Sequence, residues 1–153
     1  RPERNQKLLI DIWRRHIHTK NKDVKLLVFS NNNDFNVNGI VNMKFKNQRD
    51  LIVELNNSRV FLIPGHKAET YCLAAEEARE LCIPIVTLGI GCLSERVIHG
   101  KTGFVASSVN EFAEYALKIF AEDDLWVSLR RNLLEKRGMR SWSIVAQEFL
   151  NQI

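Results

Sequence analysis

Residues 59–87 read RVFLIPGHKAETYCLAAEEARELCIPIVT, and this stretch determines the fold class. An apolar run ends at Ile63 and is followed by Pro64-Gly65, and a second apolar run occupies residues 83–87. Between the two runs, apolar side chains recur at the spacing of an amphipathic helix over residues 70–81. A short strand, a helix and another short strand in this order predict a parallel pair of strands joined by a crossover helix.

The same alternation continues on both sides of this stretch. Upstream we expect a helix at 5–19, strands at 24–29 and 40–45 separated by a polar loop at 30–39, and a helix at 47–57. Downstream we expect a strand at 102–105, a helix opened by a capping box at 108–111, and helices at 123–136 and 142–152. Continuous apolar strands are buried on both faces. The pattern therefore predicts an α/β fold with a Rossmann-like, doubly wound parallel sheet between helical layers.

Length and composition set further limits. The chain has 153 residues, of which 45% are hydrophobic and 26% charged, as in an ordinary globular protein. This composition excludes a disordered or fibrous class, and the length predicts a single domain over residues 1–153. No apolar run approaches the roughly 20 residues that a membrane-spanning helix needs. Because the sequence opens on Arg1 rather than Met, we expect it to be a piece of a longer protein.

The positive charge is concentrated at the start of the chain. Of 22 Lys/Arg and 18 Asp/Glu residues, eight and three lie within residues 1–25, so the rest of the chain is nearly neutral. Such a basic first helix could contact nucleic acid, an anionic membrane surface or an anionic small ligand. It could equally be the solvated face of an ordinary helix, and the charge alone does not decide between these alternatives.

The cysteines and histidines show no metal-site spacing. Cys72, Cys82 and Cys92 are an odd set without a Cys-x-x-Cys pair, and we interpret them as reduced, small apolar side chains of a cytoplasmic protein. His66 and Glu69 lie three residues apart, but no second histidine follows to complete a zinc-binding helix motif. We therefore expect no metal and no other cofactor.

Ligands of doubly wound sheets bind beyond the carboxyl ends of the strands, which here indicates the loops at 30–39, 64–72 and 87–95. Within the second loop, Glu69 and Glu77 lie eight residues apart across a junction between loop and helix. A diphosphate could bind the free N–H groups of that helix start, and the carboxylates could accept hydrogen bonds from sugar hydroxyls. The alternative is that acidic residues merely complement the helix dipole.

Several motifs in order resemble one family. Glu69 and Glu77 have the E-x7-E spacing of glycosyltransferase family 4, the retaining group 1 enzymes of GT-B fold. Residues 83–87 are similar to its "G-x-P-V-V" strand, 91–97 (GCLSERV) to "G-G-x-P-E-x-V" and 100–105 (GKTGFV) to "G-x-T-G-x-L-V". Residues 2–5 (PERN) resemble the "P-E-K-G" that follows the first strand of the donor-binding domain. The resemblance extends over almost the whole chain.

The resemblance implies a role for each matching residue. Glu77 would bind the ribose hydroxyls, and Glu69 would act as the catalytic residue that contacts the donor sugar. Arg4 stands at the position of a phosphate-binding lysine. Thr70 and Tyr71 would belong to the donor-binding loop. The backbone N–H groups of the next two residues, Cys72 and Leu73, would hold the distal phosphate. The family transfers sugar on the front face without a metal, by electrostatic stabilisation of the departing diphosphate.

Some positions depart from the family pattern. Cys72 stands where the family commonly has glycine, Cys92 replaces a second glycine, and Ser94 replaces a proline. The resemblance also places a first strand, and a phosphate-binding arginine after it, ahead of residue 1, so the sheet would be one strand short. The asparagine-rich loop at 31–38 is longer and more polar than the glycine turn of the family.

The resemblance implies a function for the whole chain. It would be the C-terminal donor-binding half of a hexosyltransferase-like enzyme that uses a nucleoside-diphosphate sugar, with its N-terminal acceptor domain absent and the fragment alone inactive. Its partners would be the sugar nucleotide, that missing domain and a membrane-associated acceptor, with no nucleic acid. We expect a cytoplasmic location, peripheral at the inner face of the membrane. Two alternatives stay open: a regulatory binding module with a basic helix contacting nucleic acid or an anionic surface, and a GT-B epimerase or non-catalytic relative.

Overall fold

The computed structural model describes residues 5–29, 35–44 and 47–137, together with residues 143, 144, 147, 150 and 151. Its strands are β1 (Leu26–Phe29), β2 (Ile40–Met43), β3 (Phe61–Gly65), β4 (Ile85–Ile90) and β5 (Gly103–Val105). Its helices are α1 (Gln6–Ile12), the π-helix η1 (Trp13–Ile17), α2 (Gln48–Asn56), α3 (Leu73–Glu80), α4 (Leu93–Arg96), α5 (Val109–Ala121) and α6 (Asp123–Lys136). The predicted helix at 142–152 lies largely outside the described residues.

The described strands confirm the parallel α/β architecture. β1 pairs with β2, and β3, β4 and β5 pair in that order, with all three pairings parallel. The described strands form these two sheets rather than one continuous sheet, and β1 and β3 are the facing edges. Since every parallel connection needs a crossover, helices α2, α3 and α5 lie between or after the strands as the alternation predicts.

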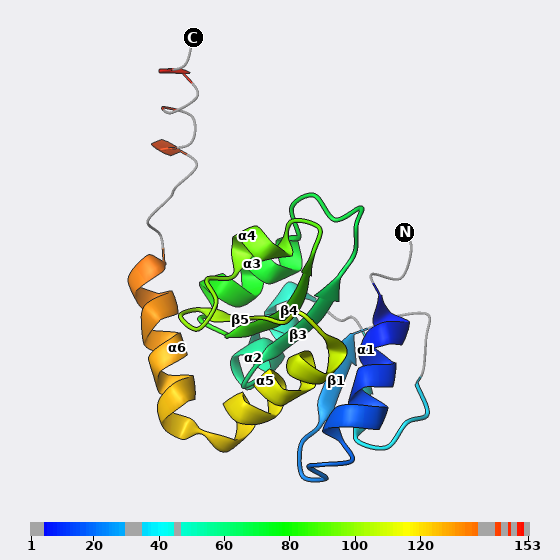
Figure 1. Cartoon of the computed structure of the whole chain (residues 1–153). Coiled ribbons are helices and arrows are strands. Elements are labelled where there is room, and N and C mark those ends of the chain that lie inside the picture. Colours follow the sequence, from blue (N-terminus) through cyan, green and yellow to red (C-terminus); the bar gives the residue numbers. More distant parts are fainter. Residues whose placement is uncertain are drawn as a thin grey trace.

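Helices cover both faces of the three-stranded sheet (Figure 1). α1, η1 and α5 pack on one face, where Trp13, Ile17, Phe112 and Ile119 are fully buried in one apolar cluster. α3 and α4 cover the other face with a second cluster that contains Ala75, Ala78 and Leu93. Residues of β1 and of the β3–β4–β5 sheet share the first cluster, so the two sheets belong to one layer.

Three predicted elements differ from the structure, and one of them is the helix expected at 70–81, which begins only at Leu73. The helix expected at 5–19 divides at Trp13, where the His18 N–H bonds the Trp13 carbonyl five residues back (2.9 Å) and forms a π-turn. Tertiary contacts hold this turn, because the Trp13 indole N–H donates to the Asn38 carbonyl (3.1 Å). The loop expected at 87–95 is shorter, since β4 continues to Ile90 and α4 follows almost at once.

Arg59, just ahead of β3, joins three elements. Its Nε donates to the Ile119 carbonyl at the end of α5 (2.8 Å), and its guanidinium pairs with Asp123 at the start of α6 (2.6 Å). The same guanidinium lies 5.0 Å from the centre of the Trp126 ring. The Trp126 indole N–H in turn donates to the Arg59 carbonyl (2.9 Å). These contacts fasten α6 to the start of the sheet.

The start of α5 confirms Ser108 as the predicted N-cap, whereas the Glu111 carboxylate bonds Ser107 and not the Ser108 N–H that a capping box requires. The Ser108 hydroxyl accepts a hydrogen bond from the Glu111 N–H (3.2 Å). The Glu111 carboxylate accepts hydrogen bonds from the hydroxyl and the N–H of Ser107 (2.7 and 2.6 Å) and from the Tyr115 hydroxyl (2.8 Å). These bonds, the one from the Ser107 hydroxyl first, lower the pKa of Glu111 from 4.5 to about 2.

The lowered pKa of Glu111 predicts a pH-dependent effect of the variant Glu111→Gln. A carboxyl whose pKa is lower in the folded state stabilises the fold above its unfolded pKa, near 4.5, and loses that contribution as the pH falls toward 2. We expect the variant to melt below the parent protein at pH 7, with the difference shrinking between pH 4.5 and 2. Melting curves across this range test the prediction, and a difference that is independent of pH would contradict it.

Candidate functional site

The predicted site residues lie in the loop from His66 to Cys72 and at the start of α3. Thr70 and Tyr71 are exposed in the loop, and Leu73, the first helical residue, is 67% exposed. Glu69 is partly buried, whereas Cys72 is buried at 2% exposure. Of the two residues that would supply backbone N–H groups, Leu73 is therefore accessible, whereas the Cys72 side chain packs into the core.

Cys72 adopts a left-handed backbone, with φ 59° and ψ 74°, immediately before α3. A residue with a Cβ is strained in this region, which explains why the resembling family commonly has glycine at this position. The Cys72 side chain packs in the apolar cluster beneath α3 and α4. The departure from the family pattern thus preserves the turn and adds a buried side chain.

The turn at Gly91 holds the Glu69 loop from the other side. The Cys92 N–H donates to the Glu69 carbonyl (3.1 Å), and the Glu69 N–H donates to the His66 carbonyl (2.9 Å). Gly91 has φ +73°, and a Cβ there would lie 2.8 Å from the Glu69 carbonyl oxygen. The backbones approach so closely that only glycine fits, and the contact fixes the main chain of Glu69.

Tyr71 is held by a charged network that sequence reasoning missed. The Arg96 guanidinium of α4 lies 4.4 Å from the centre of the Tyr71 ring and 3.2 Å from the Glu76 carboxylate. Glu76 also accepts hydrogen bonds from Arg79 (2.9 and 3.0 Å). The only sequence signal is that a charged residue, Arg96, stands within the stretch similar to "G-G-x-P-E-x-V". The network ties the loop of Glu69 to α4.

Replacing Arg96 by leucine is expected to free the Tyr71 loop while leaving the core intact. The variant loses a cation–π contact and a partly exposed ion pair, for a loss of about 1 kcal/mol in unfolding free energy. The NMR signals of the Tyr71 ring protons should move toward the shifts of an exposed tyrosine because its covering group is gone. Arg79→Leu is the matched control, since Arg79 bonds Glu76 and none of its described contacts involves Tyr71. Unchanged Tyr71 ring shifts in Arg96→Leu would contradict the prediction.

Glu77 lies in the wall of an apolar cavity at the carboxyl ends of β1 and β3. The cavity has a volume of about 470 Å³ and is lined by side chains of α1, β1, α2, β3 and α3. Gln6 and Glu77 are its two lining residues with polar side chains. Glu69 does not line this cavity. Glu77 therefore lines the cavity at the sheet end, whereas Glu69 lies in the loop before α3, whose backbone the turn at Gly91 holds.

A neighbouring cavity of about 380 Å³ lies beside the end of β2, where Asn42, Lys44 and Asp50 contribute polar groups. The Asn42 side chain accepts a hydrogen bond from the Phe35 N–H (2.9 Å) and donates to its carbonyl (3.0 Å). Asn42 thus closes the described end of the asparagine-rich loop as a neighbouring strand would. The sequence alone does not explain this loop, whereas the structure shows that the Asn42 side chain bonds the backbone of its residue Phe35.

Arg4, the predicted phosphate-binding residue, lies outside the described residues. Its neighbour Asn5 precedes α1 with φ 56° and ψ 30°, a left-handed conformation that asparagine tolerates. The resembling motif has glycine at the same place. The Asn5 amide donates a hydrogen bond to the carbonyl of Gly65, the last residue of β3. The start of α1 is therefore fixed at the carboxyl end of β3, beside the cavity that Glu77 lines.

Comparison with known families now identifies the class of protein. Residues 1–122 match the family described as group 1 glycosyl transferases. The match covers most of the chain, so the protein belongs to the group 1 glycosyltransferase family. Its parallel α/β architecture is consistent with one half of a GT-B fold. No curated protein matches the sequence.

The described residues contain neither a metal-binding cluster nor a membrane-spanning helix. No group of three or more His, Cys, Asp or Glu side chains in this part of the chain is arranged to hold a metal ion. None of the described helices is both long enough and apolar enough to cross a membrane.

Proposed function

We propose that the chain is the donor-binding domain of a retaining, metal-independent glycosyltransferase that takes a hexose from a nucleoside-diphosphate sugar. The acceptor, which we place at a membrane, binds an N-terminal domain of a longer cytoplasmic protein. Transfer requires the acceptor to be held in line with the anomeric carbon. The 153-residue chain alone therefore binds the donor without transferring its sugar.

The position of Glu77 carries this proposal. A single carboxylate in the wall of an apolar cavity suits the ribose of a nucleotide, since the apolar walls accept a flat base and the carboxylate accepts two hydroxyls. Its place at the carboxyl ends of two parallel strands is the usual ligand position of such sheets. The Glu69 loop, held by Gly91 and Arg96, would then present its carboxylate to the sugar beyond the diphosphate.

The diphosphate is proposed to lie between the start of α3 and the start of α1. The first N–H groups of α3 have no carbonyl partner within the helix and attract an anion, together with the helix dipole. Arg4, which precedes α1, would supply the positive charge, and the Asn5–Gly65 hydrogen bond brings that helix start to the sheet end. A cation and two helix starts together replace the metal that other transferases use.

The two alternatives differ from this proposal in measurable ways. A regulatory module would use exposed cations of the first helical segment, such as Lys7, Arg14 and Arg15. Its binding to a phosphate backbone would weaken steeply with salt, whereas a pocket for one diphosphate weakens modestly. A GT-B epimerase would bind the same sugar nucleotide and convert its sugar without any acceptor, which product analysis detects.

The test is calorimetric titration of the isolated chain with UDP, GDP and ADP, with and without a chelator. We expect at least one nucleotide to bind with an affinity that the chelator does not change, because the proposed site uses helix starts and Arg4 in place of a metal. Strict dependence on magnesium or manganese would refute the metal-free site. Failure of all three nucleotides to bind would refute the pocket.

A further inference from the structure

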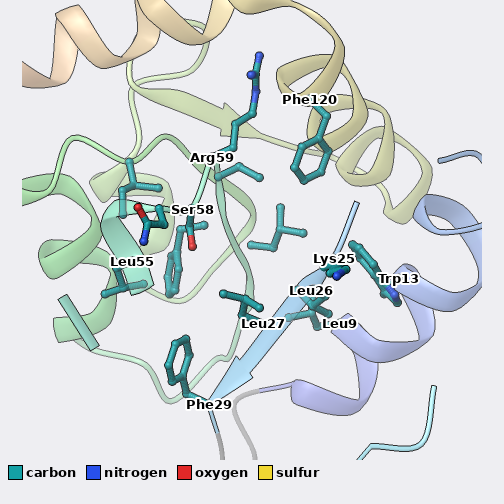
Figure 2. Close-up of a pocket in the computed structure, with 15 residues that line it drawn as sticks. Leu9, Trp13, Lys25, Leu26, Leu27, Phe29, Leu55, Ser58, Arg59 and Phe120 are labelled. Carbon is teal, nitrogen blue, oxygen red and sulfur yellow. The ribbon is translucent and has the colours of Figure 1, made fainter. Parts of the chain in front are cut away.

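The cavity of about 380 Å³ at the end of β2 adjoins the cavity of about 470 Å³ that Glu77 lines. Phe29, the last residue of β1, and Leu51 of α2 line both cavities. Figure 2 shows the Phe29 side chain at the end of β1, on the side of the strand where Leu55 of α2 lies. A flat ligand that packs on Phe29 and Leu51 therefore has the Glu77 carboxylate on one side and the end of β2 on the other.

Three charged side chains line the smaller cavity. Lys44 follows β2 directly, and Asp50 and Glu54 lie four residues apart on α2 and therefore on one face of that helix. Within the described part of the chain, none of these three charged groups forms a hydrogen bond or an ion pair. Glu54 is partly buried, where a charged group needs a partner. The cavity thus offers one cationic donor and two anionic acceptors beside an apolar wall.

Such a set of groups discriminates between nucleotide bases by hydrogen bonding. The Watson–Crick edge of guanine presents two adjacent donors, N1–H and the 2-amino group, beside the acceptor O6. Adenine and cytosine present an acceptor nitrogen in place of N1–H, and a carboxylate opposite that nitrogen is repelled. Uracil presents one donor between two carbonyl oxygens, so it satisfies a single carboxylate oxygen. Among these four bases, guanine is the one that matches both the carboxylates and the lysine.

We propose that the base of the donor nucleotide is guanine, so that the chain takes a guanosine-diphosphate sugar. The inference rests on the proposed function, because it takes the ribose of that nucleotide to be bound by Glu77. The guanine ring packs on the two apolar side chains that the cavities share. Its N1–H and 2-amino group donate hydrogen bonds to the carboxylates of Glu54 and Asp50. Its O6 accepts a hydrogen bond from the Lys44 ammonium.

The alternative is that Lys44, Asp50 and Glu54 are only solvated charges at the surface of the cavity. Lys44 and Asp50 are exposed, as such a role requires. In that case the base contacts nothing but the apolar wall, and the affinity for a nucleoside diphosphate depends little on which base it carries. The two explanations therefore differ in base preference, which is measurable without any substitution.

The first test is calorimetric titration of the chain with GDP, IDP, ADP and UDP. Hypoxanthine, the base of IDP, keeps N1–H and O6 and lacks the 2-amino group, so GDP and IDP differ by one hydrogen-bond donor. We expect GDP to bind at least about tenfold more tightly than IDP, since a hydrogen bond to a charged group is lost. ADP and UDP should also bind more weakly than GDP. Equal affinities for GDP and IDP, or tighter binding of ADP or UDP, would overturn the inference.

The second test uses the double variant Asp50→Asn/Glu54→Gln, which replaces both carboxylates by amides of the same size. We expect it to bind GDP and IDP about equally, and to bind xanthosine diphosphate more tightly than the parent chain does. The gain arises because an amide N–H donates to the 2-carbonyl of xanthine, which a carboxylate repels. The control Glu114→Gln/Glu135→Gln makes the same change of charge at exposed positions of α5 and α6 and should keep the preference for GDP.

The outcomes separate this inference from the proposed function. A double variant that keeps the parent's preference for GDP over IDP would overturn the role of the two carboxylates. A parent chain that binds UDP or ADP in preference to GDP, without dependence on a metal, would refute guanine and leave the proposed function standing. Failure of all nucleotides to bind would refute both.

Discussion

Replacing Glu77 by alanine is expected to weaken the binding of a nucleoside diphosphate by about ten- to a hundredfold. The Glu77 carboxylate is the only acidic group among the described residues that line the 470 Å³ cavity, so it is the one charged acceptor there for ribose hydroxyls. Loss of a charge-assisted hydrogen bond costs about 1.5–3 kcal/mol, which corresponds to this range of affinity. Calorimetry with the nucleotide that binds the parent chain measures the effect directly.

Two variants make the Glu77 experiment specific. Glu69→Ala should leave the affinity for the nucleotide nearly unchanged and lower the affinity for its sugar conjugate, because Glu69 lies outside the cavity wall. Glu80→Ala removes a carboxylate from the same helix one turn further on, where it pairs with Arg137 (3.7 Å), and controls for the change of charge. Equal and small effects of all three substitutions would support the alternative that these carboxylates only complement the helix dipole.

Replacing Trp13 by alanine is expected to lower the free energy of unfolding by about 3–5 kcal/mol. The Trp13 side chain is fully buried, stacks on the His18 ring with centroids 5.6 Å apart, and donates its indole N–H to the Asn38 carbonyl. Its removal opens a cavity beneath η1 and leaves that carbonyl without this donor. Urea denaturation at neutral pH gives the free energies to be compared.

Trp13→Phe separates the two contributions of this residue. The phenyl ring keeps most of the packing and loses the hydrogen bond to Asn38, so the variant should lose only about 1–2 kcal/mol. Leu134→Ala, at a site that is 59% exposed on α6, should change stability by less than about 0.5 kcal/mol. If Trp13→Ala lowers the free energy of unfolding by less than about 1 kcal/mol, other contacts stabilise the π-turn.

The alternation of strands and helices was predictable because it depends on local periodicity. Apolar runs ending at Ile63 and over 83–87 became β3 and β4, and Ser108 caps the start of α5 as expected. The division of the first helix at Trp13 was not predictable, since a contact with Asn38 in a distant loop holds it. The separation into two sheets likewise depends on pairing between distant segments, which periodicity does not encode.

The candidate site was predictable to a lesser degree. Spacing alone indicated Glu69 and Glu77 as a pair, and Glu77 lies at the end of the sheet where the fold rule places ligands. Spacing did not indicate that Glu77 lines the cavity and Glu69 does not, because the walls of the cavity come from segments that are distant in the sequence. The contact of Arg96 with Tyr71 joins residues 25 positions apart and has no local signature. Arg4 lies outside the described residues, and its role stays a prediction.

The contacts of Arg59 determine how the last described helix would come apart. α6 cannot detach without breaking the ion pair of Arg59 with Asp123, the stacking of Arg59 on Trp126 and the hydrogen bond from the Trp126 indole to the Arg59 carbonyl. It also buries Leu129 and Leu133, so detachment exposes core surface. Fraying of α6 is thus coupled to opening of the sheet. Tryptic cleavage after Arg130 or Arg131 would consequently report opening of the whole α/β unit rather than local mobility of one terminal helix.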